Sequence, residues 1–171
     1  TIKALLAGKH VFVEKPLCLT EDELKEIRSV YEKKAPDGLQ LMVGFNRRFS
    51  PHAQEAGRFF ASRVNPLVML YRINAGRIPA DHWVQHPDIG GGRLIGEMCH
   101  FVDYMQALSA SPPTSVYASR IGRHSSGITD DQCSIVVNFA DGSIGTIIYT
   151  AEGSSELPKE RFEAHADGKS L

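Results

Sequence analysis

Apolar residues in the first quarter of the chain alternate between unbroken runs and a helical spacing. The run Val11–Val13 is continuous, as in a strand buried in a parallel sheet. Thr20 and Glu23 have the spacing of a capping box, which predicts a helix that begins there and ends near Lys34. A second apolar run, 39–45, follows a Pro-Asp-Gly turn. This strand–helix–strand order is typical of half of a doubly wound sheet.

The pattern continues with a helix, a strand and a long polar segment. Ser50 and Pro51 form a helix start, with serine as the N-cap, and we expect this helix to reach about residue 62. Aliphatic and aromatic residues at 66–75 predict a strand. The segment 76–92 has no periodicity, but it contains the only tryptophan of the chain. We therefore expect an ordered functional loop there.

A long helix is predicted from about residue 93 to residue 110. Its apolar side chains form one stripe at helical spacing. They are Leu94, Met98, Phe101, Val102, Met105 and Leu108. Gly96, His100 and Asp103 fall on the opposite face, and Glu97 lies on the flank beside His100.

The last third of the chain has the pattern of antiparallel strands, with a hairpin at 140–143. The expected strands are 116–121, 132–139, 144–150 and 161–166. A parallel strand–helix–strand unit followed by antiparallel strands indicates an α/β chain with two domains.

The composition excludes several classes of protein. The formal net charge of the 171 residues is −1, so there is no basic field for nucleic acid. No apolar stretch approaches the length of a membrane span. The three cysteines lack metal-type spacing, and their odd number without a secretory signal predicts a cytoplasmic protein. Because no methionine precedes Thr1 and the hairpin at 167–169 has only the start of a return strand, we expect a piece of a longer protein.

Lys15 is the first candidate for chemistry, because it follows a strand at the edge where open α/β sheets bind ligands. Pro16 stops the strand, and a cis bond before it turns the lysine out of the strand line. A partly desolvated lysine transfers a proton or polarises an oxygen. The alternative is a surface Glu14–Lys15 pair before a turn, or a Glu14 side chain on the opposite face.

His100 is the second candidate, as a proton acceptor near neutral pH. It faces away from the apolar stripe, and Gly96, one turn earlier, leaves space above it. Glu97 is placed to orient the imidazole ring. A solvated or core histidine, with a plain surface acid at position 97, is the alternative.

Arg47 and Arg48 follow the second strand and suit a substrate carboxylate or phosphate. The structural alternative is one arginine in a salt bridge and the other exposed. Gly90–Gly92 before a helix suits either an anion or a hinge, and Trp83 suits either ring stacking or packing.

A metal site is not predicted. His82 and His86 have i,i+4 spacing, which places two ligands together only on a helix. Pro87 and the loop context argue against a helix there.

Three segments together resemble one enzyme family. They are 7–16 (AGKHVFVEKP), 44–51 (GFNRRFSP) and 90–103 (GGGRLIGEMCHFVD). In residues, order and spacing they resemble the glucose-fructose oxidoreductase / inositol dehydrogenase / MocA family, and the resemblance spans the whole chain.

The resemblance implies hydride transfer between NAD or NADP and a carbon of a sugar, sugar nucleotide or cyclitol. It implies that residues 1–45 are the remnant of a Rossmann domain, and that 46–171 form an α/β domain with an open, mostly antiparallel sheet. A homodimer through that sheet and a small sugar or polyol substrate are expected, with no nucleic-acid or membrane partner. A non-catalytic ligand-binding or regulatory protein of the same fold is the alternative.

The same resemblance implies roles for individual residues. Lys15 and His100 are the expected catalytic pair, near the nicotinamide and on the substrate hydroxyl. The expected cofactor-binding residues are Glu14, Lys15, Pro16 and Asn46. The expected substrate-binding residues are Arg47, Arg48, Trp83, Glu97 and Asp103.

The chain departs from the family pattern in two places. Many members have an aspartate where this chain has Gly96; either Glu97 replaces it or the substrate differs from the usual polyol. The glycine-rich nucleotide fingerprint is not in this chain, so the fragment alone is not expected to hold a dinucleotide. The segments 44–51 and 96–103 also resemble the branch fused behind a zinc-alcohol-dehydrogenase-like domain.

Overall fold

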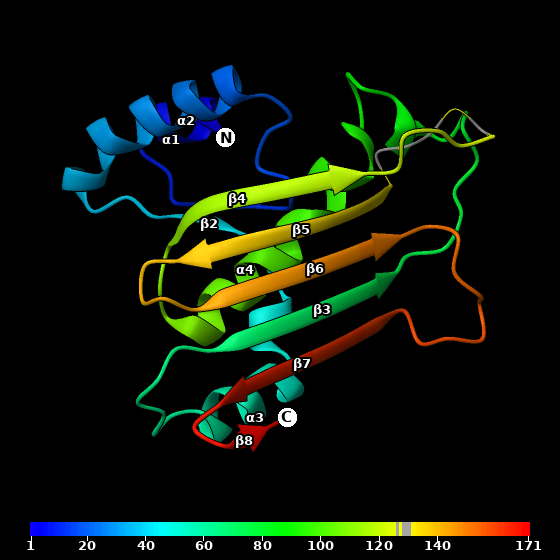
Figure 1. The fold of residues 1–171 in the computed structure, drawn as a ribbon. Helices are drawn as coiled ribbons and strands as arrows, with labels where there is room; N and C mark the ends of the chain where they lie inside the picture. Colours follow the sequence, from blue (N-terminus) through cyan, green and yellow to red (C-terminus); the bar gives the residue numbers. More distant parts are fainter. Residues whose placement is uncertain (126, 128–130) are drawn as a thin grey trace.

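The computed structural model describes residues 1–125, 127 and 131–171, and it contains two sheets (Figure 1). The smaller sheet joins β1 (Val11–Val13) and β2 (Leu41–Val43) in parallel. Beside it lie α1 (Ile2–Leu6) and α2 (Glu21–Lys34), which contact each other. The predicted strand–helix–strand unit is therefore present.

The start of α2 is the capping box that the sequence predicts. Thr20 Oγ1 accepts a hydrogen bond from the Glu23 amide, and the Glu23 carboxylate accepts one from the Thr20 amide, each at 3.2 Å. Two of the otherwise unpaired amides of the first turn are satisfied in this way.

The larger sheet has six strands in the order β4-β5-β6-β3-β7-β8. They are β3 (Val68–Asn74), β4 (Pro113–Arg120), β5 (Gln132–Phe139), β6 (Ile144–Thr150), β7 (Glu160–Ala166) and β8 (Lys169–Ser170). β3 runs parallel to β6, and the other neighbouring pairs are antiparallel. The expected open, mostly antiparallel sheet is confirmed, while the domain division after residue 45 stays a prediction.

The predicted helix 93–110 is wrong in one respect: it is two consecutive helices. A π-helix covers Leu94–Met98, and α4 (Cys99–Ser109) follows it. Ala110 ends α4 in the left-handed conformation, with φ of 55°. Hydrophobic spacing does not distinguish a π turn from an α turn, and the π turn makes tertiary hydrogen bonds that the sequence does not indicate. The helix predicted to reach about residue 62 is α3 (Pro51–Phe59), which ends three residues earlier than expected.

The apolar stripe of this helical segment packs on the larger sheet, as predicted. Met98, Phe101 and Met105 are buried against residues such as Ile147 and Tyr149 of β6. The remaining stripe residues, Leu94, Val102 and Leu108, are partly buried against the same cluster. In Figure 1, α3 and α4 lie behind the sheet, so the face toward the viewer carries no helix.

The opposite face of α4 is not open to solvent. His100 is 2% exposed and Asp103 is 8% exposed. A 3₁₀ turn at Arg47–Phe49 covers this side of the helix. Within the described residues, no helix is both long and apolar enough to cross a bilayer.

Two valines test this account of the core. Val137 on β5 is 3% exposed, whereas Val64 is 88% exposed. We expect Val137→Ala to lower the free energy of unfolding by about 2 kcal/mol, because it removes two buried methyl groups and leaves a cavity. Val64→Ala is the matched control and should stay within about 0.5 kcal/mol of the parent. Urea denaturation followed by circular dichroism measures both; equal effects would contradict the assignment of the core.

Candidate functional site

Lys15 lies two residues beyond β1, and the bond between it and Pro16 is cis. Its side chain turns toward the π-helix, where Nζ donates a hydrogen bond of 2.9 Å to the Gly96 carbonyl. Glu14 forms no ion pair with Lys15 in the part of the chain that the structure describes; its exposed carboxylate instead lies against Gly44. The surface-pair alternative for Glu14 and Lys15 therefore does not hold.

His100 lies in the first turn of α4, and Phe45 meets its ring edge-on with 6.2 Å between ring centroids. Its Nδ1 is buried without a hydrogen-bond partner among the described residues. Burial, together with the charges of Arg47 and Lys15, lowers the pKa of the imidazole to about 4. The ring is therefore neutral at neutral pH and able to accept a proton.

The structure thus brings Lys15 and His100 together. The carbonyl that binds Lys15 precedes His100 by one turn, and the Lys15 charge acts on the imidazole. Beside Lys15 is a cavity of about 300 Å³. Its lining residues are Lys15, Pro16, Ile78, Trp83, Val84, Ile89, Gly90, Arg93, Gly96 and Glu97. It combines an apolar wall with one ammonium group, which suits a small polar molecule beside a flat ring.

Glu97 does not orient His100, contrary to one interpretation of the sequence. Its Oε2 accepts hydrogen bonds from Tyr149 Oη at 2.6 Å and from Arg93 at 3.3 Å. Its Oε1 binds the Lys159 ammonium at 2.5 Å. Burial alone raises the pKa of this carboxyl, but these donors and charges lower it to about 2. Glu97 is therefore not a free surface acid, and its substrate-binding role stays a prediction.

Neither arginine at the end of β2 is free. Arg48 forms a two-pronged ion pair with Asp103, at 2.8 Å to Oδ2 and 2.5 Å to Oδ1. Arg47 binds Glu160 at 2.8 Å and lies over the ring of Phe101. The structural alternative is right about a salt bridge but wrong about an exposed second arginine, because each arginine pairs with a carboxylate within the fold. The predicted substrate roles of Arg48 and Asp103 conflict with this pairing.

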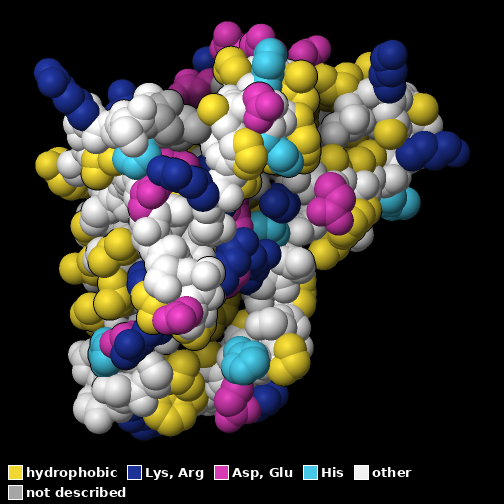
Figure 2. All heavy atoms as spheres, turned by 90° about the vertical axis from the view of Figure 1, so that its right-hand side faces the viewer, with side chains coloured by type: hydrophobic (Ala, Val, Ile, Leu, Met, Phe, Trp, Pro, Cys, Tyr) yellow, Lys and Arg dark blue, Asp and Glu magenta, His cyan; other side chains and the backbone are white. Residues whose placement is uncertain are grey.

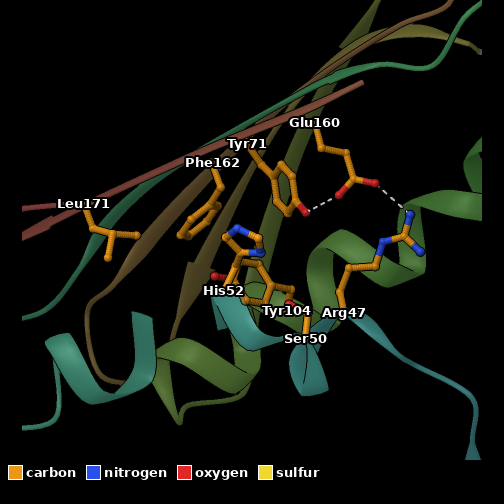
Figure 3. A pocket seen from close by; sticks show the side chains of 8 residues that line it. All are labelled: Arg47, Ser50, His52, Tyr71, Tyr104, Glu160, Phe162 and Leu171. Atoms are coloured by element: carbon orange, nitrogen blue, oxygen red, sulfur yellow. Dashed lines mark hydrogen bonds and ion pairs between the residues drawn. The ribbon is translucent and has the colours of Figure 1, made fainter. Parts of the chain in front are cut away.

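A second cavity, of about 460 Å³, lies where β3 and β7 approach the turn that carries Arg47 (Figure 3). Tyr71 Oη donates to Glu160 at 2.6 Å, so one carboxylate holds both Tyr71 and Arg47. Tyr104 and Phe162 supply aromatic walls. Burial raises the pKa of Tyr104 to about 12, so it remains a hydroxyl.

The loop 76–92 makes backbone hydrogen bonds around Gly90, in line with the ordered loop expected from its tryptophan. The Gly90 and Gly91 amides both donate to the His86 carbonyl, and a Cβ at Gly90 would lie 2.4 Å from the Val84 backbone. These two amides are thus used inside a turn, against the anion-binding interpretation. Trp83 is 60% exposed and faces the cavity of Lys15.

The remaining predicted residues have local roles. Asn46 is exposed, and its Oδ1 accepts a hydrogen bond from Arg47 at 3.2 Å. His82 and His86 each accept, through Nδ1, the amide two residues later. No cluster of metal-ligand side chains occurs among the described residues.

Sequence reasoning missed four residues of this region: Tyr71, Tyr149, Lys159 and Glu160. Glu160 shares its strand face with Phe162 and Ala164, so alternation along β7 indicates an inward acid. Tyr149 likewise alternates with Ile147. Lys159 precedes its strand, and no pattern marks it. Figure 2 shows basic and histidine side chains gathered around a hollow at the end of the sheet where β3 and β6 finish.

Comparison with known proteins accounts for both parts of the chain. Residues 1–45 match the model "Oxidoreductase family, NAD-binding Rossmann fold", and residues 66–171 match "GFO/IDH/MocA C-terminal domain". The inositol 2-dehydrogenase of Rhizobium meliloti is 28% identical over 165 residues, which are 93% of this chain and 48% of that protein. The NAD(+)-dependent scyllo-inositol 2-dehydrogenase of Bacillus subtilis is 34% identical over 118 residues, 67% of this chain and 32% of that protein.

Solved structures agree. An oxidoreductase domain protein from Kribbella flavida has a TM-score of 0.78 and 25% identity, over 99% of this chain and 51% of its own. A NAD-binding protein from Listeria innocua has a TM-score of 0.72 and 27% identity, over 96% of this chain and 48% of its own. The chain spans about half the length, or less, of these proteins. Its C-terminal match covers more than half of its residues, and the chain therefore belongs to the GFO/IDH/MocA family of oxidoreductases.

Proposed function

We propose that the protein containing this chain is a NAD(P)-dependent dehydrogenase that oxidises a hydroxyl carbon of a cyclitol or sugar, or runs the reverse reduction. The observation that carries this proposal is that the Lys15 ammonium, which lines a cavity, is held by a carbonyl one turn before the buried, neutral His100. The inositol dehydrogenases among the relatives support the substrate class. The fusion to a zinc-alcohol-dehydrogenase-like domain stays a prediction.

The cavity beside Lys15 fits the nicotinamide end of the cofactor. Ile78, Val84 and Ile89 offer apolar surface for a flat ring, and Lys15 lies at its edge. Glu14, Lys15, Pro16 and Asn46, after the ends of β1 and β2, are the residues of this chain proposed to hold it. When bound, the nicotinamide supplies or accepts the hydride.

The residues of the chain then accept the proton of the substrate hydroxyl and stabilise the negative charge that develops on its oxygen. The neutral His100 ring accepts the proton of the substrate hydroxyl, because its pKa of about 4 leaves it unprotonated. Lys15 has three N–H donors, and the Gly96 carbonyl takes one of them. The other two are available to stabilise the alkoxide that develops on the substrate.

The first test uses the protein with its full sequence. We expect saturable binding of NADH, followed by fluorescence, and turnover of at least one member of a panel of inositols and aldoses. Lys15→Met and His100→Asn should each lower kcat by about 10²- to 10⁴-fold, the range for loss of acid–base or alkoxide support. Lys25→Met, in an exposed pair with Asp22, is the matched control and should not change kcat.

Three outcomes contradict the proposal. A folded protein that binds neither NADH nor NADPH is not a dehydrogenase of this kind. One that binds NADH and turns over no member of the panel supports the regulatory alternative. Normal turnover by Lys15→Met removes the role of the lysine.

The second test is the pH profile of kcat/KM. Activity should fall as the pH drops through about 4, because His100 then takes up a proton and no longer accepts one. Since the Lys15 charge lowers the pKa of His100, the residual activity of Lys15→Met should show its acid limb at higher pH. An acid limb near pH 6.5 in the parent protein, the ordinary value for histidine, would contradict the lowered pKa of His100.

We also propose a homodimer through the open face of the larger sheet. Exposed apolar side chains lie on that face, opposite the residues that pack on α4. They are Val68, Tyr117, Ile144 and Ile148. A face of this kind requires a partner, and a two-fold pairing of identical faces is the simplest arrangement.

Light scattering on a sizing column tests the dimer. The parent protein should elute as a dimer at micromolar concentration. Ile148→Glu should shift it to the monomer, because it places a charge in the apolar face. Val64→Glu is the control on a different, exposed segment and should leave the dimer intact. A parent protein that is monomeric at high concentration would rule out this interface.

A further inference from the structure

A buried ionic network lies directly beneath the cavity of Lys15. Its centre is the Glu97 carboxylate, which binds Tyr149, Arg93 and Lys159. The side chains of Arg93 and Glu97 are only 5% and 14% exposed. Each carboxylate oxygen accepts at least one hydrogen bond from the protein, although Glu97 also lines the cavity. Its place next to Lys15 therefore suits a further role.

The network holds the π-helix against the ends of β6 and β3 and against the residue that precedes β7. Arg93 donates to the Tyr149 hydroxyl at 2.8 Å and to the carbonyls of Gly76 at 2.9 Å and Ala75 at 3.2 Å. Tyr149 is on β6, and the two carbonyls follow β3. Lys159, just before β7, is itself fixed, because its carbonyl accepts the Asn74 amide at 2.7 Å. Three strand ends thus hold one turn of helix.

That turn presents the hydrogen-bond acceptor of Lys15. Gly96 precedes Glu97, and its carbonyl accepts the only hydrogen bond that Lys15 Nζ makes within the described residues. Gly96 has no side chain to anchor it, and a Cβ there would meet only the Gly90 carbonyl, at 3.5 Å. The direction of its carbonyl is therefore set by its neighbours in the π-helix, and Glu97 is the neighbour with the tertiary bonds.

We propose that Glu97, held by Arg93, Tyr149 and Lys159, is a positioning residue that fixes the π-helix so that the Gly96 carbonyl directs the Lys15 ammonium into the cavity. The inference rests on the proposed function only in the use that it gives to Lys15.

The charges of the network suit a fixed support. The Glu97 carboxyl stays ionised because hydrogen bonds from Lys159 and Tyr149 outweigh the effect of burial, and its pKa is about 2. Burial and the Glu97 charge raise the pKa of the Tyr149 hydroxyl, so it remains a donor. Glu97 and Tyr149 therefore keep their protonation states over the neutral pH range, as a permanent positioning device requires.

The experiment compares four variants of the full-length protein. Glu97→Gln keeps the shape and removes the charge, and Tyr149→Phe removes a single hydroxyl and keeps the buried ring. Glu97→Asp keeps the charge and tests rescue. Glu55→Gln breaks an exposed pair with Arg58 on α3 and is the matched control. Circular dichroism first confirms that each variant is folded; Tyr149→Phe carries the test if Glu97→Gln is not.

Two readouts report on Lys15. The first is its rate of acetylation by acetic anhydride, followed by peptide mass spectrometry and referred to exposed Lys25 in the same sample. Glu97→Gln and Tyr149→Phe should raise the Lys15 rate by about two- to tenfold, the factor that corresponds to one hydrogen bond. The second is turnover, where kcat should fall by about ten- to a hundredfold while KM is unchanged. Glu97→Asp should recover part of both, and Glu55→Gln should change neither.

The outcomes are distinguishable. Unchanged Lys15 labelling in both Glu97→Gln and Tyr149→Phe overturns the positioning role, even if kcat falls. Raised labelling in either folded variant, with kcat lost and KM retained, supports it. If the parent protein turns over no substrate, the proposed function has failed, and the labelling alone still decides whether Glu97 positions Lys15.

Discussion

The hydrogen bond from the Lys15 ammonium to the Gly96 carbonyl joins the two parts of this chain at the candidate site. Lys15 belongs to the small parallel unit, and Gly96 belongs to the helical segment that packs on the large sheet. This contact holds the ammonium beside the cavity that both parts line. His100 follows one turn later on the same segment. The proposed chemistry depends on this contact, because it places the cation and the base on a common support.

The sequence predicts those elements whose signals are local. The capping box at Thr20, the N-cap at Ser50 and the strands β5 and β6 all appear where their patterns indicate. The sequence does not predict the π-helix, because its apolar residues keep an ordinary helical spacing. Its backbone accepts a hydrogen bond from a residue far away along the chain, which no local pattern indicates. The sequence does not decide whether His100 is buried, because the helix pattern alone does not show what covers its polar face. In the folded chain, the turn at Arg47–Phe49 covers that face.

The candidate site likewise contains residues that the sequence indicates and partners that it does not. Lys15 and His100 are found from sequence because strand ends and helix faces limit where they can lie. The partners of the charged residues are not found, since a carboxylate and an arginine pair across many residues without any shared pattern. Arg48 with Asp103, Arg47 with Glu160, and Glu97 with Lys159 are all pairs of this kind. A buried charge requires such a partner, but the sequence does not say which one.

The parallel pairing of β3 with β6 has a consequence for how this site can diversify. Parallel neighbours cannot be joined by a tight turn, so the chain must cross over between them. The segment 76–92, the π-helix and α4 all belong to that crossover. Apart from Lys15 and Pro16, the walls of the cavity thus come from this connection and not from the strands of the larger sheet. Substitutions in the segment 76–92 can therefore change the walls of the cavity without changing a residue of the larger sheet.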